Sequence, residues 1–230
     1  MTDVSSPPQR IQQNLLAASE KRLLAWICPR LPAWVTPDGL TGLAILANLC
    51  IGFGYGMSAL SPGWLALSIG AYFVHWFGDS LDGSIARFRR IERPRYGYLV
   101  DHSADVFGAL VMFVGIGFSP YVEAEVALLT TAAYFMLMAH TFIMAKVAGE
   151  FPMSHLGAGP TELRLILIAL TIAMWVVGPD ARWFGGLGPF DYIFGAAAIV
   201  MVAVFLVQTI AAARRMAQLD AAARRDQEIR

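Results

Sequence analysis

Six apolar runs, each about twenty residues long, decide what this chain can fold into. About twenty mostly apolar residues in a helix cross the hydrocarbon core of a bilayer. The chain is 57% hydrophobic and only 15% charged, against roughly 25% charged residues in soluble domains. We therefore expect an all-α integral membrane protein with six transmembrane helices. The runs cover approximately residues 40–60, 63–87, 98–118, 122–147, 162–177 and 190–213.

Lysine and arginine are distributed unevenly over the links between these runs. The chain holds 17 of them. With six spans, only Arg182 falls on the side opposite to all the others. Because short cytoplasmic loops collect Lys and Arg, we expect both termini and the acidic site described below to face the cytoplasm. We favour the bacterial inner membrane over an organellar one.

The N-terminal part is too polar to be a span. Leu16, Leu23 and Ile27 share one helical face among charged residues, a pattern typical of an amphipathic helix at a membrane surface. No basic face with interleaved aromatic residues stands apart from the membrane flanks, so we expect no nucleic-acid partner. The expected segments are an N-terminal cytoplasmic or interfacial helix (1–39), the six-helix membrane domain (40–213) and a cytoplasmic tail (214–230).

Four aspartates interrupt the apolar pattern at the end of the second run and the start of the third. Asp79 and Asp82 are three residues apart, and Asp101 and Asp105 are four apart, so each pair shares a helix face. The two runs are antiparallel neighbours, which brings all four carboxylates to a similar depth. An ionised carboxylate inside a span costs about 2.5–3.5 kcal/mol, and too few Lys or Arg lie nearby to neutralise four. We therefore expect two hard divalent cations with oxygen ligands, a pair suited to phosphoryl displacement.

The residues around these acids suit a nucleotide. Gly83 and Ala86 have little bulk on the side of the acids, which leaves room for a ribose or a base. Arg87 follows at once and can bind a phosphate with its planar guanidinium. The acids alone also fit an intramembrane cation transporter, and this alternative stays open. Transport, however, does not require these three residues.

The spacing resembles the signature of the CDP-alcohol phosphotransferase family. That signature reads Asp-x2-Asp-Gly-x2-Ala-Arg, then Gly-x3-Asp-x3-Asp. Its eight fixed positions are occupied by Asp79, Asp82, Gly83, Ala86, Arg87, Gly97, Asp101 and Asp105. The resemblance implies a membrane enzyme of phospholipid biosynthesis, with six helices around a cytoplasm-facing polar cavity and usually a homodimer.

The resemblance also implies a role for each acid. Asp79, Asp82 and Asp101 would bind two divalent cations, Mg²⁺ or Mn²⁺. Asp105 would touch a metal as well and would act as the general base on the acceptor hydroxyl. That hydroxyl would attack the phosphorus distal to cytidine, and CMP would leave.

The nucleotide contacts implied by the resemblance are Gly83, Ala86 and Arg87. The family often has Pro-Asn-x2-Thr at the start of its first span, and here the segment begins at Pro37 and ends at Thr41, with Asp38 in place of Asn. Thr41 is therefore a further candidate nucleotide contact.

A second polar segment precedes the fifth run. Glu162 and Arg164 either belong to an ordinary helix start, where an acid is favourable, or face the acceptor at the mouth of the cavity. The string Gly-Pro-Thr-Glu at 159–162 resembles a segment of the choline/ethanolamine branch of the family.

Two substrate schemes are therefore compatible with the sequence. In one scheme, CDP-diacylglycerol donates to a small polar alcohol. In the other, a CDP-choline or CDP-ethanolamine type of donor serves a lipid hydroxyl. At least one substrate is a lipid in either scheme.

Some further side chains carry structural expectations. Gly52, Gly56 and Gly115 are expected to serve helix packing. His102 is expected to point away from the face that Asp101 and Asp105 share.

Overall fold

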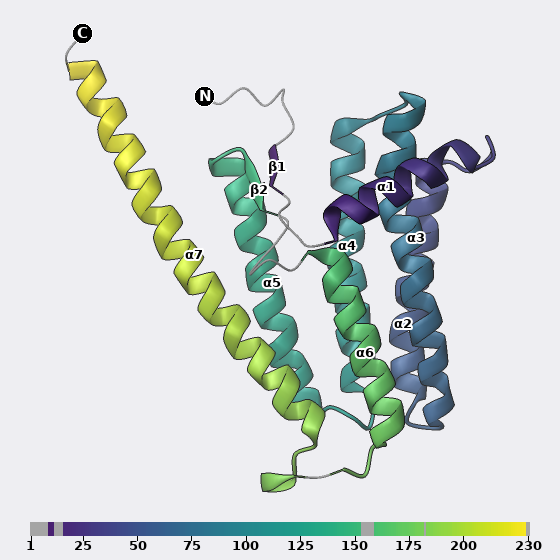
Figure 1. The fold of residues 1–230 in the computed structure, drawn as a ribbon. Helices are drawn as coiled ribbons and strands as arrows, with labels where there is room; N and C mark the ends of the chain where they lie inside the picture. Colours follow the sequence, from purple (N-terminus) through teal and green to yellow (C-terminus); the bar gives the residue numbers. More distant parts are fainter. Residues whose placement is uncertain (1–8, 12–15, 153–158, 182, 229–230) are drawn as a thin grey trace.

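Helices make up nearly all of the described chain (Figure 1). The computed structural model describes residues 9–11, 16–152, 159–181 and 183–228. Two three-residue strands, β1 (Gln9–Ile11) and β2 (Glu150–Pro152), pair in parallel. The α-helices are α1 (Ala17–Ile27), α2 (Pro37–Met57), α3 (Leu65–Arg89), α4 (Pro94–Gly117), α5 (Ala124–Val147), α6 (Pro160–Val177) and α7 (Pro189–Glu228). The expected all-α membrane fold is confirmed.

Five of the described helices are long and apolar enough to cross a membrane: α2, α4, α5, α6 and α7. The second expected run corresponds to α3, which is not among them. Its first half is apolar, but its second half carries Asp79, Asp82, Arg87 and Arg89. Because α3 packs along α2, a sixth span remains compatible with the bundle, and the count of six stays a prediction.

Four of the long helices begin at proline, at Pro37, Pro94, Pro160 and Pro189. Proline suits the first turn of a helix because its ring sets φ and its missing N–H has no partner to lose there. At the start of α2, the Thr36 hydroxyl also accepts a hydrogen bond from the Gly39 N–H at 3.1 Å. The helices therefore start within a few residues of the positions at which the apolar runs begin. The last one continues without a break past residue 213, the expected end of the membrane domain.

Glycines allow the helices of the α2–α3–α4 bundle to approach closely. A Cβ atom added to Gly115 of α4 would lie 2.2 Å from the Gly52 carbonyl oxygen of α2. One added to Gly78 of α3 would lie 2.6 Å from the Leu40 carbonyl oxygen. The packing role expected for Gly52 and Gly115 is confirmed, whereas a Cβ on Gly56 would meet only Phe118 Cβ at 3.9 Å. These contacts hold the two helices that carry the acids against α2.

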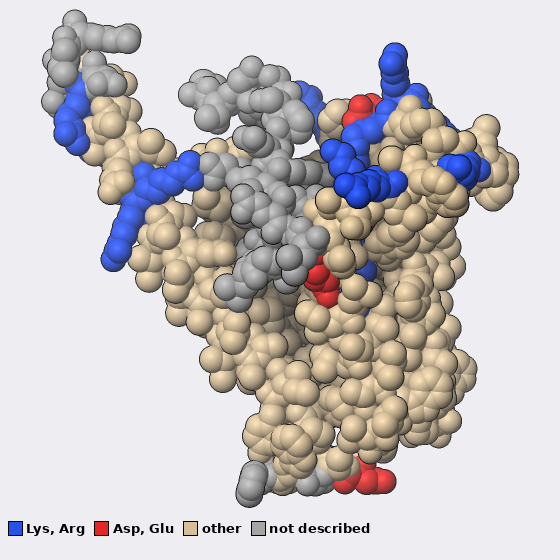
Figure 2. Space-filling view, viewed as in Figure 1, with Lys and Arg blue, Asp and Glu red and all other residues tan. Residues whose placement is uncertain are grey.

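Most basic residues gather at one end of the molecule, the end that also holds α1 and the last turns of α7 (Figures 1 and 2). At this end α1 runs obliquely across the bundle, from the flank of α3 to the start of α6. The Arg89 guanidinium fixes the chain between α1 and α2, donating to the carbonyl oxygens of Leu31, Pro32 and Val35 at 3.1, 2.8 and 2.5 Å. Arg182, expected at the opposite end, lies outside the described residues. The cytoplasmic orientation stays a prediction.

Replacing Gly115 with alanine should destabilise the bundle, because the new Cβ would overlap the backbone of α2. We expect a loss of about 1–3 kcal/mol, the usual cost of overpacking a close contact, measured as a lower melting temperature in detergent. Gly56→Ala is the matched control, since its Cβ meets only an ordinary contact. Equal melting temperatures for Gly115→Ala and the control would contradict this packing.

Candidate functional site

A cavity of about 1260 Å³ opens among the helices at the basic end of the bundle. All four aspartates of the acidic cluster line it: Asp79 and Asp82 from α3, and Asp101 and Asp105 from α4. Residues of α1, α2, α5, α6 and α7 also line it. The structure therefore brings the four acids to one cavity.

Two of the acids form a compact group with a histidine. Ligand atoms of Asp101, His102 and Asp105 all lie within 4.8 Å of one another. The His102 ring packs against Tyr98, with centroids 4.1 Å apart, and its Nδ1 lies 3.4 Å from Asp101 Oδ2. The expectation that His102 faces away is wrong: the ring reaches back along the helix to the carboxylate that precedes it.

Asp79 has a cationic partner that the sequence did not predict. Arg164 of α6 pairs with the Asp79 carboxylate, and its Nε donates to His75 Nδ1 at 3.0 Å. The contact is well covered, since 12% of the Arg164 side chain is exposed. Arg164, expected at the mouth of the cavity, therefore supplies part of the counter-charge of the acids. The described lining residues of the cavity carry five carboxylates and three basic side chains (Lys21, Arg87 and Arg164), so the site keeps an excess of negative charge.

Asp82 faces α2. Its Oδ2 accepts a hydrogen bond from the Thr41 hydroxyl at 2.7 Å, and its Oδ1 accepts one from the Gly83 N–H at 2.5 Å. Thr41, a candidate nucleotide contact, is not among the described residues that line the cavity. In this structure it acts on the site through Asp82.

Of the other candidate nucleotide contacts, Gly83 and Arg87 line the cavity. The Arg87 side chain folds over Gly83, where a Cβ atom would lie 3.3 Å from Arg87 Nη1. Its Nη2 donates to Ser84 Oγ at 3.3 Å. Ala86 is not among the described lining residues. A guanidinium thus lies beside the acids, at the exposed edge of the cavity.

Glu162 is engaged with backbone groups. Its Oε2 accepts from the Gly159 N–H at 3.1 Å and its Oε1 from the Leu16 N–H at 2.8 Å. Both contacts satisfy N–H groups at helix starts, where acidic side chains are favourable. These contacts favour the helix-start interpretation, and a role of Glu162 in acceptor binding stays a prediction.

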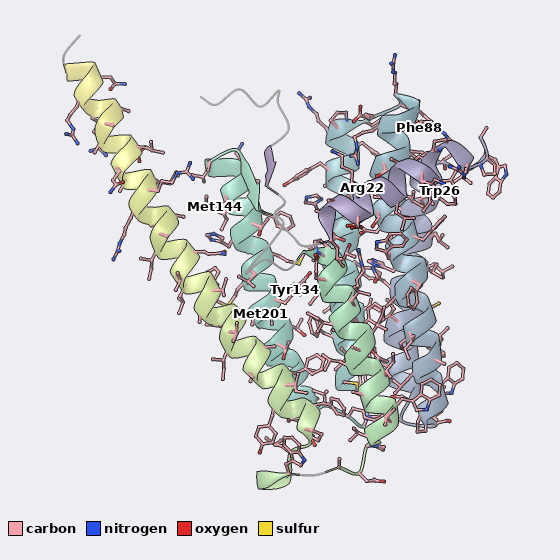
Figure 3. All side chains as sticks on the ribbon, in the orientation of Figure 1. Arg22, Trp26, Phe88, Tyr134, Met144 and Met201 are labelled. Carbon is pink, nitrogen blue, oxygen red and sulfur yellow. The ribbon has the colours of Figure 1, made fainter. Side chains whose placement is uncertain are left out.

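Three lining residues were missed by sequence reasoning. Asn48 of α2 is buried, with 7% of its surface exposed. Tyr134 projects from α5 into the space between α5 and α6 (Figure 3). Glu20 reaches the cavity from α1. Each lies in a different run from the acids, so no local spacing could indicate it.

The fold and the cavity define an integral membrane protein with an acidic internal site. A sequence profile described as CDP-alcohol phosphatidyltransferase matches residues 34–211, more than half of the chain. The chain therefore belongs to the CDP-alcohol phosphatidyltransferase family, as the resemblance implied, and it is a transferase of phospholipid biosynthesis. No curated protein sequence matches the chain in a direct comparison.

Replacing Arg164 with methionine should destabilise the metal-free protein, because the Asp79 carboxylate would lose its buried counter-charge. Removing one partner of a buried ion pair costs about 3–5 kcal/mol. We expect a lower melting temperature in EDTA, partly restored by Mn²⁺. Arg95→Met, which removes an exposed arginine, should leave the melting temperature unchanged. An unchanged melting temperature for Arg164→Met would show that the pair does not stabilise the site.

Proposed function

We propose that this chain transfers a substituted phosphate group from a CDP-linked donor to an acceptor hydroxyl and releases CMP. The observation that carries the proposal is the cavity, where four aspartates gather and the described lining residues include more acidic than basic side chains. A nucleotide diphosphate is an anion, so it can enter such a site only if cations shield it from the carboxylates. The signature spacing and the family match support the same conclusion.

The donor set fits hard divalent cations. Asp101, His102 and Asp105 already present ligand atoms within 4.8 Å of one another, and carboxylate oxygens are the ligands that Mg²⁺ and Mn²⁺ prefer. We assign Asp79, Asp82 and Asp101 as ligands of two such ions, with Asp105 also in contact. When bound, the ions supply positive charge to the moving phosphoryl group. When the metals bind, the ion pair between Arg164 and Asp79 would break, so that Asp79 can bind a metal. The Arg164 side chain would then lie beside the substrate with its positive charge.

Asp105 is assigned as the general base. Its carboxylate takes the proton from the acceptor hydroxyl as the acceptor oxygen bonds to the phosphorus distal to cytidine. The bond between that phosphorus and the bridging oxygen breaks, and CMP carries away the electron pair. Asp105 suits this step because it lies deeper in the bundle than Asp101, one helical turn further along α4.

The CDP group is assigned to the exposed edge of the cavity. Gly83 leaves room for close approach, and Arg87 offers its guanidinium to a phosphate. Ala86 and Thr41 would complete this side, Thr41 through its hydrogen bond to Asp82.

The opposite side of the cavity suits a lipid. α7 packs mainly on α5, and α6 packs mainly on α3. The part of the cavity wall that α6 and α7 form is lined by apolar side chains. The lining residues there are Leu163, Leu167, Val200, Met201 and Val204, and Figure 3 labels Met201 on α7. We propose that the lipid substrate lies along this wall in a homodimer whose site faces the cytoplasm. A lipid donor and a lipid acceptor would both suit this apolar wall. An experiment is therefore needed to distinguish the two substrate schemes.

Replacing Asp105 with asparagine should stop turnover because the amide cannot accept the proton. We expect CMP release to fall at least about a hundredfold, while binding of Mn²⁺ measured by electron paramagnetic resonance is mostly retained. Asp220→Asn, at an exposed position of α7, is the matched control and should keep full activity. Full activity in Asp105→Asn would show that another group is the base.

A panel of donors identifies the substrate scheme. Purified protein with Mn²⁺ is offered CDP-diacylglycerol with small alcohols, or CDP-choline and CDP-ethanolamine with diacylglycerol, and the lipids formed are identified by mass spectrometry. We expect CMP and a phospholipid from one class. Movement of cations across vesicles, with no CMP from any donor, would favour the transporter instead.

A further inference from the structure

The Glu20 carboxylate projects from α1 to the cavity, where one of its oxygens accepts three hydrogen bonds. The donors are Trp76 Nε1 at 3.0 Å, Ser80 Oγ at 3.0 Å and Thr161 Oγ1 at 2.9 Å. Trp76 and Ser80 lie one turn apart on α3, whereas Thr161 lies in the first turn of α6. One carboxylate therefore joins three helices at the cavity wall.

These stretches of α3 and α6 are the ones that also carry the Arg164 contacts. The two partners of Arg164 on α3, His75 and Asp79, each immediately precede a donor to Glu20. Arg164 itself lies three residues after Thr161, on the same face of α6. Two sets of polar contacts thus connect α3 and α6. One is made by the Arg164 guanidinium of α6, and the other, called the tie below, is made by the Glu20 carboxylate of α1.

The first two turns of α6, residues 160–166, contain none of the side chains buried within this helix. The residues buried within this helix are Leu167, Thr171 and Met174, all of them C-terminal to Arg164. Its main neighbour among the described elements is α3. Because these two turns bury no apolar side chain, we expect polar contacts to determine how they pack on α3.

The helix that carries Glu20 is itself anchored at both ends. At its start the Leu16 N–H donates to Glu162 Oε1 at 2.8 Å. Just after its end, Cys28 is buried in a cluster with Leu81 and Ile85 of α3. These contacts therefore fix the position of α1 across α3 and α6.

We infer that Glu20 is a positioning residue of this site: by binding Trp76, Ser80 and Thr161 it holds α6 in the register that presents Arg164 to Asp79. The tie itself follows from the contacts alone, and its effect on turnover rests on the proposed function of the cavity. Glu20 contacts no reacting atom in this account and acts through Arg164.

A distance measurement tests the tie without reference to catalysis. Spin labels are placed at Leu23→Cys on α1 and Ile166→Cys on α6, both exposed positions, in the full chain with its two native cysteines replaced by serine. We expect a narrow distance distribution that broadens with Glu20→Ala or Thr161→Val and stays narrow with Arg22→Gln, an exposed control on α1. A distribution that stays narrow in Glu20→Ala overturns the tie.

Enzyme kinetics test whether the Glu20 contacts affect turnover. The substrate is the CDP donor that the wild type turns over. We expect Glu20→Ala to lower kcat about tenfold, the scale of lost hydrogen bonds to a charged group, with the KM for the donor nearly unchanged. Glu20→Gln, which keeps an acceptor oxygen at the same reach, should recover most of the rate. In an Arg164→Lys background Glu20→Ala should cost little more, because both changes affect the same contact.

The same tenfold loss in the Arg164→Lys background would overturn the link to Arg164. If the wild type releases no CMP from any donor, the proposed function fails, and the label distances still decide whether Glu20 ties α1 to α6.

Discussion

Charge balance inside an apolar bundle is the constraint on which this structure depends. Four aspartates line one cavity, and Arg164 pairs with one of them, Asp79. Such an excess of negative charge is stable only in contact with water or with cations. Close glycine contacts bring α3 and α4 against α2, so the carboxylates meet at one place. The packing that brings the acids together therefore also concentrates negative charge in the cavity, and this concentration of charge is the physical basis of the proposed cation binding.

The helices follow from the sequence because their signals are local. Apolar runs, breakers and prolines at the first turn place helix ends within a few residues. The spacing of Asp79, Asp82, Asp101 and Asp105 within two runs likewise predicts two helix faces that meet. The exception is α3, whose charges remove it from the helices recognised by hydropathy. The aspartates that α3 contributes to the proposed site also weaken its signal as a span.

The side-chain partners could not be predicted, since they join runs that are far apart in the chain. Arg164 reaches Asp79 across 85 residues, and Glu20 reaches Thr161 across 141. Sequence spacing also assigned His102 to the wrong side, because the direction of a ring depends on its rotamer and on neighbours such as Tyr98. Long-range polar contacts of this kind hold α1 and α6 at the cavity, and they determine how the acids are presented.

The most direct test of the central claim is anomalous diffraction from crystals grown with Mn²⁺ and a CDP compound. Two anomalous peaks should lie about 3.5–4 Å apart, bounded by Asp79, Asp82, Asp101 and Asp105, with the pyrophosphate in contact with both. Arg164 should then be found beside the substrate and no longer paired with Asp79 alone. Peaks outside the cavity, or carboxylates that keep their present partners while the nucleotide binds elsewhere, would contradict the account.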